Sequence, residues 1–530
     1  MSAASWMQGV AAAWRALDER RAALIAFLVT LSVGLATMTP DLIGVFFDDA
    51  IYVLVGKAIA EGQGYVYPQL PGTPPAIHYP PVWPAIIALV WKLGPAFPDN
   101  IGLLKALNPF ILAIGATGGT VVLRRMFGFS PALAMFAVVA ATASIPVQVL
   151  TNVLLSEPLF IALLFPSLWW AERSRAEGGW RLAAIAGAFA GTLVLTRTIA
   201  GAYVVATGLA LLWERRWRET AVYSAVVLLL IAPWQYFVWK HSPGFPDELR
   251  GSYGPYLEWV ANGYRGGGLP FLREVVAKNV ADAWRFTGAV LTPRLPDGAL
   301  RPLAATLAMI ASLSGLGVSL WRPSTRILAL GTLGYAAIVV VWPFQVDRFL
   351  WAIWPLLLVL ALDGVRTAVR VMRASGRQQL AGATLAIAAA LAFGHTVYNI
   401  RGFSRGWASS ASRGMSEREA PAVRAANRES RLRGLTIAAE AAPMVALYTG
   451  LKVVPVEMLL VEDHLRQKTT QQRSAILEAI DARFRPDAYL LKPSGPYLYA
   501  LTRARLDSSR RFVEIPTGDP DARIFLHTSQ

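Results

Sequence analysis

The sequence predicts a polytopic all-α membrane protein of about eleven transmembrane helices, followed by a C-terminal α/β soluble domain. Of the 530 residues, 55% are hydrophobic and only 16% are charged, against roughly 25% charged residues in soluble globular proteins. The apolar residues gather in segments long enough to cross a bilayer, which takes about 20 helical residues. Charged side chains make up about 26% of residues 401–530 but about 12% of residues 1–400. We therefore predict a membrane domain over 1–400 and a soluble domain over 401–530.

Two features of the composition limit the chemistry of the chain. There is no cysteine, so a disulfide scaffold, a zinc-thiolate site, an iron-sulfur cluster and a thiol nucleophile are excluded. The formal net charge is +16, and in a membrane protein such an excess of Lys and Arg lies mainly in cytoplasmic loops. The charge therefore orients the chain in the membrane and does not indicate nucleic-acid binding.

Eleven apolar segments are the candidate spans. They cover residues 22–39, 102–123, 131–149, 154–171, 181–196, 199–213, 220–239, 302–321, 326–342, 349–364 and 380–398. Basic residues cluster in every alternate connection, as at Arg124 and Arg125 or at Arg15, Arg20 and Arg21, and the positive-inside rule makes these connections cytoplasmic. The first segment could pass for a signal peptide, but the spans after it favour a retained anchor. This predicts an inner (plasma) membrane protein with a cytoplasmic N-terminus and an extracytoplasmic tail.

Two connections on the outer side are long, residues 39–100 and 241–300. Within the first, residues 82–93 are apolar but too short to span, so we expect a helix lying along the membrane surface. Within the second, residues 262–268 include three consecutive glycines. This pattern predicts a mobile segment, which is either a lid beside a site or a plain linker.

The tail alternates short strands with helices. The expected strands are residues 435–439, 452–456, 488–492, 512–515 and 523–527, and the expected helices are residues 443–448 and 474–483. Runs of β-branched and aromatic residues bounded by turn residues support the strands. We therefore expect a small α/β unit.

An acidic pair, Asp48 and Asp49, follows the first apolar segment. Two adjacent carboxylates at a membrane surface repel one another and lose solvation, which raises one pKa and suits a general base or a cation ligand. On a helix Asp48 shares a face with Tyr52, while Asp49 points about 100° away. Helix capping and the helix dipole explain the pair equally well.

A proline pair lies about thirty residues further on. Pro80 and Pro81 fix a rigid, extended corner directly after His78 and Tyr79. His78 at this corner is either a hydrogen-bond donor to an anionic group or an exposed loop histidine with no task.

Three further charged residues are expected at the same membrane face. Glu157 opens an apolar segment, either as a helix cap or as an ionisable group that faces a cavity. Arg197 and Arg348 lie at the outer ends of spans. Each can bind a phosphate through its fork of N–H groups or extend to lipid headgroups, and Arg348 can pair with Asp347.

Five stretches of the chain occur in an order typical of one enzyme family. They are residues 47–52 (FDDAIY), 62–65 (GQGY), 78–84 (HYPPVWP), 156–159 (SEPL) and 348–350 (RFL). The first three resemble the first outer loop of GT-C fold glycosyltransferases, in particular the protein O-mannosyltransferase and aminoarabinose-transferase-like group. The last two resemble later landmarks of that group, so the resemblance covers most of residues 20–400.

The resemblance implies an enzyme that transfers a sugar from a polyprenyl-phosphate donor to a lipid, glycan or protein acceptor on the outer face of the membrane. Direct displacement would invert the anomeric centre. Some members require a divalent cation at the acidic pair and others do not, so a cation is a possible cofactor.

The resemblance also implies roles for individual residues. It places Asp48 and Asp49 at the catalytic position, one of them as the base that accepts the acceptor's proton. The other implied residues are the candidates for donor-phosphate binding, His78, Arg197, Arg348 and the weaker candidate Lys57, and the supporting residues Tyr52, Tyr79 and Glu157.

Two rival functions fit a chain of this class. A lipid-linked-sugar flippase or another transporter more often shows paired repeats and broken helices at mid-membrane, whereas the polar candidates here gather at one surface. A catalytically silent relative that acts as a scaffold through its tail is the other rival.

Overall fold

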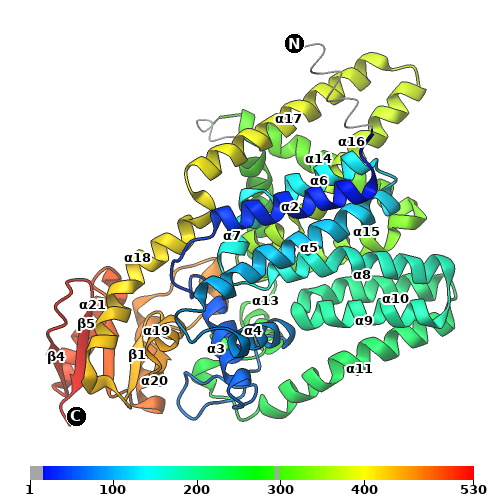
Figure 1. The fold of residues 1–530 in the computed structure, drawn as a ribbon. Helices are drawn as coiled ribbons and strands as arrows, with labels where there is room; N and C mark the ends of the chain where they lie inside the picture. The colour runs from blue at the N-terminus through cyan, green and yellow to red at the C-terminus, as the bar shows by residue number, and fades with distance from the viewer. Residues whose placement is uncertain (1–15, 293–297, 530) are drawn as a thin grey trace.

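A computed structural model describes residues 16–292 and 298–529, so the basic residue Arg15 lies outside the described residues. Long helices form the larger part of the molecule, and a five-stranded sheet lies at its C-terminal end (Figure 1). This arrangement confirms the predicted fold class.

All eleven predicted spans are helical. The helices are α2 (Glu19–Thr37), α5 (Ile101–Phe127), α6 (Pro131–Thr142), α7 (Ile145–Asn152), α8 (Glu157–Glu177), α9 (Trp180–Thr196), α10 (Gly201–Trp213), α11 (Trp217–His241), α14 (Leu300–Trp321), α15 (Arg326–Val340), α16 (Asp347–Ala374) and α17 (Gln378–Ser404). Within the described residues, seven helices are long and apolar enough to cross a membrane, or eight if α6 and α7, bent by 56°, form one span.

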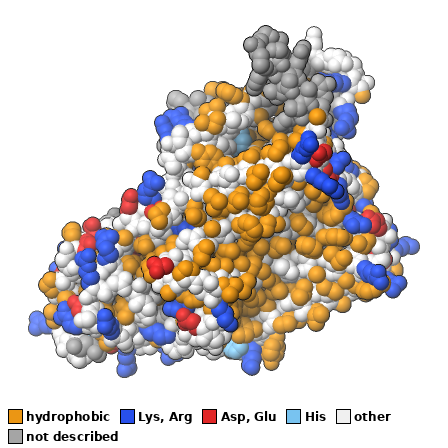
Figure 2. Space-filling view, in the orientation of Figure 1, with side chains coloured by type: hydrophobic (Ala, Val, Ile, Leu, Met, Phe, Trp, Pro, Cys, Tyr) orange, Lys and Arg blue, Asp and Glu red, His pale blue; other side chains and the backbone are white. Residues whose placement is uncertain are grey.

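The prediction of about eleven spans therefore exceeds the number of helices that meet this criterion. The three remaining segments are α8, α9 and α10. Helices α9 and α10 are only 17 and 13 residues long, and the last turns of α8 carry several charged side chains. Apolar side chains nevertheless cover most of the helical part in the face that Figure 2 shows. Leu24, Leu28, Phe110 and Ile114 are among the exposed apolar residues of the long helices, which suits a lipid environment.

The first long connection folds into two helices, α3 (Asp48–Ala60) and α4 (Val82–Leu93). The helix expected at residues 82–93 is thus confirmed. The two helices cross closely at Gly56, where a Cβ atom would lie 2.7 Å from Cγ2 of Ile87. In Figure 1 they lie between the long helices and the C-terminal sheet.

The second long connection differs from the prediction. Residues 262–268 lie within α13 (Tyr256–Leu291), which follows the short helix α12 (Arg250–Tyr253), and only Gly268 departs from helical geometry, with φ 60°. Glycine tolerates a positive φ, so it joins two helical stretches at a kink. The second stretch is anchored by Phe271 and Val275, which share a hydrophobic cluster with Val461 of the tail.

The tail contains the five predicted strands, β1 (Thr436–Ala439), β2 (Lys452–Pro455), β3 (Ala488–Leu491), β4 (Phe512–Ile515) and β5 (Arg523–His527). Their order is β2-β1-β3-β5-β4. Strand β1 pairs in parallel with β2 and β3, while β5 pairs antiparallel with β3 and β4. The predicted helices are α19 (Ala442–Thr449) and α20 (Thr470–Phe484), and α18 (Trp407–Arg428) and α21 (Pro496–Ser509) are additional.

The tail and the first connection share one hydrophobic core. Ile43 and Val45, which precede α3, belong to the same buried cluster as Leu447 of α19 and Val454 of β2. Helix α17 runs across residue 400, and α18 leads from it into the tail. The domain boundary near residue 400 stays a prediction. Residues 39–60 pack both against residues that precede this boundary and against residues of the tail.

Candidate active site

Four charged side chains meet where α3, α8, α9 and α16 begin or end, and we call them the site cluster: Asp48, Glu157, Arg197 and Arg348. The Nη1 atom of Arg348 donates to Oδ2 of Asp48 at 2.8 Å. Its Nη2 and Nε atoms both donate to Oε1 of Glu157, at 2.9 and 3.1 Å. Arg197 forms an ion pair with Oε2 of Glu157, at 2.9 Å. One carboxylate thus holds two arginines side by side, and the formal charges of the cluster balance.

The site cluster is partly open. The Glu157 side chain is fully buried, whereas those of Asp48 and Arg348 are about one fifth exposed, at 19% and 20%. Burying charge is costly unless the charges are paired, which explains why the four groups bind each other. Partial exposure of Asp48 and Arg348 leaves the contact between them accessible to a ligand.

Tyrosine and serine hydroxyls take part in the hydrogen bonds of the site cluster. Tyr79 donates its hydroxyl to Oδ1 of Asp48 at 2.7 Å. The Tyr52 ring packs on Tyr79 at 4.7 Å, and the Tyr52 hydroxyl lies 3.3 Å from Oγ of Ser156. Arg197 also donates to Ser156, at 3.2 Å. The hydrogen bonds from Tyr79 and Arg348 fix the orientation of the Asp48 carboxylate.

The two arginines also lie over aromatic rings. The guanidinium of Arg348 lies 5.4 Å from the ring centre of Phe46, and that of Arg197 lies 5.7 Å from Phe349. A ring face stabilises the cation without using its N–H groups. The N–H groups therefore remain directed at carboxylates or at any anion that replaces them.

Asp49 has different surroundings from its neighbour. Its side chain is buried and accepts the backbone N–H groups of Gly44 at 2.7 Å, Val45 at 3.0 Å and Phe46 at 3.0 Å. Burial raises the pKa of Asp49, against the opposing effect of these three hydrogen bonds. The two aspartates therefore have different partners. Asp48 belongs to the site cluster, whereas the Asp49 carboxylate binds the backbone of residues 44–46.

His78 lies close to the site cluster but is uncharged at neutral pH. Its Nδ1 faces the carbonyl oxygen of Gly254, and its ring lies 3.8 Å from that of Tyr256 and 4.4 Å from that of Tyr79. Burial lowers the pKa of His78 to about 4. At neutral pH the ring is therefore uncharged, and its Nδ1–H donates to the carbonyl.

Lys57 is not brought to the cluster. It lies toward the other end of α3, 4.0 Å from Glu61 and over the ring of Trp91. The helix carries it away from Asp48 because the two residues are more than two turns apart.

The acidic pair does not fit a divalent cation. Both oxygens of Asp48 bind Tyr79 or Arg348, and those of Asp49 bind backbone N–H groups. Among the described residues there is no group of three or more His, Asp or Glu side chains placed to hold a metal. A cation at Asp48 would also lie beside the positive charge of Arg348, so we derive no step through a metal.

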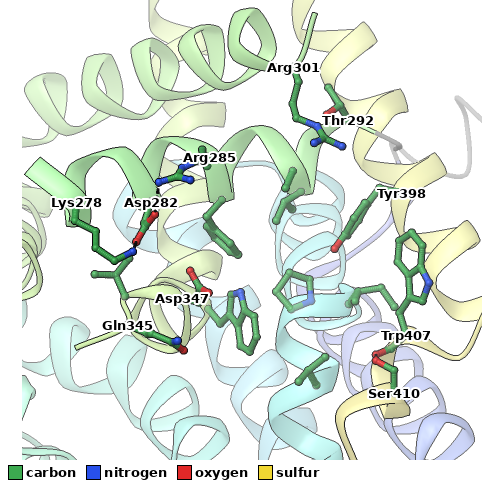
Figure 3. Close-up of a pocket in the computed structure, with 18 residues that line it drawn as sticks. Lys278, Asp282, Arg285, Thr292, Arg301, Gln345, Asp347, Tyr398, Trp407 and Ser410 are labelled. Carbon is green, nitrogen blue, oxygen red and sulfur yellow. Dashed lines mark hydrogen bonds and ion pairs between the residues drawn. The ribbon is translucent and has the colours of Figure 1, made fainter. Parts of the chain in front are cut away.

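A cavity of about 730 Å³ adjoins the first turn of α16 (Figure 3). Asp347 lines it, while the next residue, Arg348, turns to the site cluster. Lys278 and Arg285 of α13 also line it, and both pair with Asp282, at 2.8 and 2.7 Å. Trp351 and Trp407 add aromatic surface. A mixture of charged and aromatic side chains suits a polar ligand that carries a sugar or a phosphate.

Comparison with known proteins finds similarity at the level of structure. No protein-family profile matches the chain, and no curated protein is significantly similar to it in sequence. ArnT from Cupriavidus metallidurans bound to undecaprenyl phosphate is 13% identical, with a TM-score of 0.47, covering 95% of this chain and 97% of that chain. The apo state of ArnT is 16% identical, with the same score and coverage. The apo oligosaccharyltransferase of Archaeoglobus fulgidus is 13% identical, with a TM-score of 0.49, covering 89% of this chain and 69% of that one.

Three contributors to the site have weak sequence signals. Phe46 lies two positions before Asp48 and Ser156 lies directly before Glu157, but their contacts with arginine depend on the fold. Tyr256 lies in the second long connection, beside a proline, and nothing in its surroundings indicates that it packs on His78. Only the approach of α13 to the first connection brings these two rings together.

Proposed function

We propose that the chain is a membrane glycosyltransferase that moves a sugar from a polyprenyl-phosphate donor to an acceptor hydroxyl, with inversion at the anomeric carbon. The observation that carries the proposal is the pairing of Asp48 with Arg348, which Glu157 in turn joins to Arg197. A carboxylate that accepts a proton and a clamp for an anion are the two groups that this transfer needs, and here they touch.

The donor phosphate first replaces Asp48 as the partner of Arg348. Phosphate is bound strongly by a pair of planar guanidinium groups. The exchange leaves the Asp48 carboxylate held by Tyr79 alone, with one oxygen available to the acceptor. Donor binding thereby prepares the base.

The acceptor oxygen then attacks the anomeric carbon on the side opposite the phosphate. The new C–O bond forms as the bond from carbon to the phosphate oxygen breaks, and the electron pair stays on the leaving polyprenyl phosphate. Asp48 takes the proton of the acceptor hydroxyl. Arg197 and Arg348 stabilise the negative charge that develops on the phosphate. A single displacement of this kind inverts the anomeric centre.

Other parts of the chain have supporting roles in this proposal. The cavity beside Asp347 provides space for a substrate headgroup close to the cluster. His78 acts as a neutral group that packs on Tyr79, and Asp49 acts through the backbone. The cluster lies at the outer face of an inner (plasma) membrane, with the N-terminus cytoplasmic and the tail outside. The acceptor is a lipid, a glycan or a protein at that face.

The test is a transfer assay with purified protein in lipid, radiolabelled polyprenyl-phosphate sugars and membrane extract as the source of acceptors. We expect the wild type to move label to an acceptor and Asp48→Asn not to do so. Label that instead changes leaflets in sealed vesicles, without transfer, would identify a flippase and contradict the proposal.

A further inference from the structure

The segment that leads into Asp48 is held at every residue from 42 to 46. We call residues 39–47 the Asp48 strap. The backbone N–H of Leu42 donates to Oγ of Ser416 in α18 at 3.2 Å, and that of Ile43 donates to the hydroxyl of Tyr448 in α19 at 2.8 Å. The next three N–H groups donate to the carboxylate of Asp49. Five consecutive donors of a loop are therefore bound by side chains from three different elements.

The start of the strap is held from a fourth element. The Nζ atom of Lys105, a buried residue of α5, donates to the carbonyl oxygens of Thr39 at 2.9 Å and Asp41 at 2.6 Å. The strap is thus fixed to the long helices at one end and to the tail in its middle.

The strap ends in a strained turn. Phe47 has φ 66° and ψ −55°, and the N–H of Asp48 donates to the carbonyl oxygen of Phe46 at 2.6 Å. These values define a classic γ-turn, which is rare and strained. A positive φ at a phenylalanine persists only where the surroundings over-determine it. The turn sets the direction in which α3 begins and therefore the direction of the Asp48 side chain.

Helix α19 of the tail packs directly on the strap. Gly44 has φ +120°, and a Cβ atom there would lie 2.8 Å from Cβ of Met444. The Tyr448 ring also packs on Phe97, 5.0 Å away. A substitution in α19 therefore reaches Asp48 through only a few residues of backbone.

We propose that Asp49 and Tyr448 are positioning residues, which hold the γ-turn at Phe47 and thereby aim Asp48 at the arginines. In this view α19 completes the catalytic centre although it contributes no group that touches substrate. The inference rests on the proposed function for the role of Asp48. Preorganisation explains the arrangement, because an error of about 1 Å in the place of a reacting group can cost roughly 100-fold in rate.

The test compares Tyr448→Phe with Tyr489→Phe in the full-length protein in lipid. Both substitutions remove a tyrosine hydroxyl that is hydrogen-bonded within or from the tail, but Tyr489 bonds to Asp481 and not to the strap. Hydrogen exchange of the amides of residues 42–46 reports on the strap, and transfer kinetics report on Asp48. We expect Tyr448→Phe to speed exchange about tenfold and to lower kcat about tenfold, with an unchanged KM for the donor. Tyr489→Phe should change neither.

Asp49→Asn is the stronger variant, because one carboxylate oxygen becomes an amide NH2 that cannot accept a hydrogen bond. Unchanged hydrogen exchange of residues 42–46 in both Tyr448→Phe and Asp49→Asn would overturn the inference. Faster exchange with an unchanged kcat would overturn it too. If the wild type transfers no sugar but the variants exchange faster than the wild type, the proposed function is overturned. The contact by which the tail fixes the strap is then still supported. The two failures are therefore distinguishable.

Discussion

Two clusters of paired charge lie at different levels along the same two helices, α8 and α16. Helix α8 carries Glu157 at one end and Glu172 fifteen residues later, and α16 carries Arg348 and Asp363 with the same separation. Fifteen helical residues correspond to about 22 Å. The second group, with the arginines that bind it, we call the anchor cluster: Glu172, Arg175, Arg322, Asp363 and Arg366.

The anchor cluster binds the backbone of neighbouring connections. Glu172 accepts the N–H of Ile327 at 2.8 Å, and Arg175 donates to Glu172 and to the carbonyl oxygen of Pro323, each at 2.8 Å. Arg366 donates to the carbonyl oxygens of Phe127 and Gly128. These contacts tie α8 to the start of α15 and to the connection before it, and tie α16 to the end of α5.

The arginines of the site cluster bind differently. In the part of the chain that the structure describes, the hydrogen bonds of the Arg197 and Arg348 guanidinium groups go to side chains and none goes to a backbone carbonyl. A side chain can turn away when a ligand arrives, whereas a backbone carbonyl in a packed helix end cannot. Buried charge alone therefore does not mark a site in this protein. Exchangeable partners distinguish the site from the anchor. Partial exposure does not, since the Arg322 and Arg366 side chains of the anchor cluster are each 25% exposed.

The largest contrast is expected between two aspartates, each of which pairs with an arginine at 2.8 or 2.9 Å. Asp48→Asn should lower transfer about 10³-fold, because an amide cannot accept the proton, and should leave thermal stability nearly unchanged. Asp363→Asn should lower stability and leave transfer per folded molecule unchanged. Both quantities are measurable on the same preparations. Equal losses of transfer in the two variants would remove the distinction between the clusters.

A second contrast concerns the arginines. Arg348→Ala should weaken binding of polyprenyl phosphate roughly 100-fold, because it removes a charged partner in a partly dry site. Arg322→Ala, the matched change in the anchor cluster, should leave that affinity unchanged. Titration of both variants with polyprenyl phosphate in nanodiscs measures the effect. If Arg348→Ala weakens acceptor binding instead, Arg348 does not contact the donor phosphate.

Stability should respond most at the anchor cluster. Arg175→Ala leaves the buried carboxylate of Glu172 without its arginine, and breaking such a pair costs about 3 to 5 kcal/mol. The free energy of unfolding in lipid or detergent should fall accordingly, with donor affinity retained. A variant that keeps its stability and loses transfer would assign the anchor cluster to the site.

The smallest effect concerns pH. The folded-state pKa of His78 is about 4, below the ordinary value of 6.5, so the unfolded chain binds more protons between these values. The contribution of neutral His78 to stability is complete above pH 6.5 and is lost as the pH falls toward 4. At pH 5 the loss is about 2 kcal/mol. Thermal unfolding at pH 7.5 and pH 5 should show a smaller decrease for His78→Gln than for the wild type, and equal decreases would mean that His78 is charged in the folded protein.

Much of the local structure could be predicted from the sequence. The helical segments and the five strands follow from stretches of apolar residues and from β-branched runs, which depend only on neighbours in the chain. Residues 262–268 are an exception, because the glycines suggested mobility, whereas residues 262–267 are helical and Tyr264 packs against the cluster of Phe271 and Val461. The number of spans is another exception, since α9 and α10 are shorter than apolar composition suggests.

For the candidate site, the residue types could be predicted from the sequence: an acidic pair, two arginines, a glutamate and a histidine. Which of these residues contact one another depends on the folded chain. It joins Arg348 to Glu157 across 191 positions, separates Asp48 from Asp49 and buries His78 in its neutral form. The reason is physical. Side-chain type and helical periodicity are local properties, whereas partner choice, burial and the strained turn at Phe47 arise from contacts between elements that are distant in the chain.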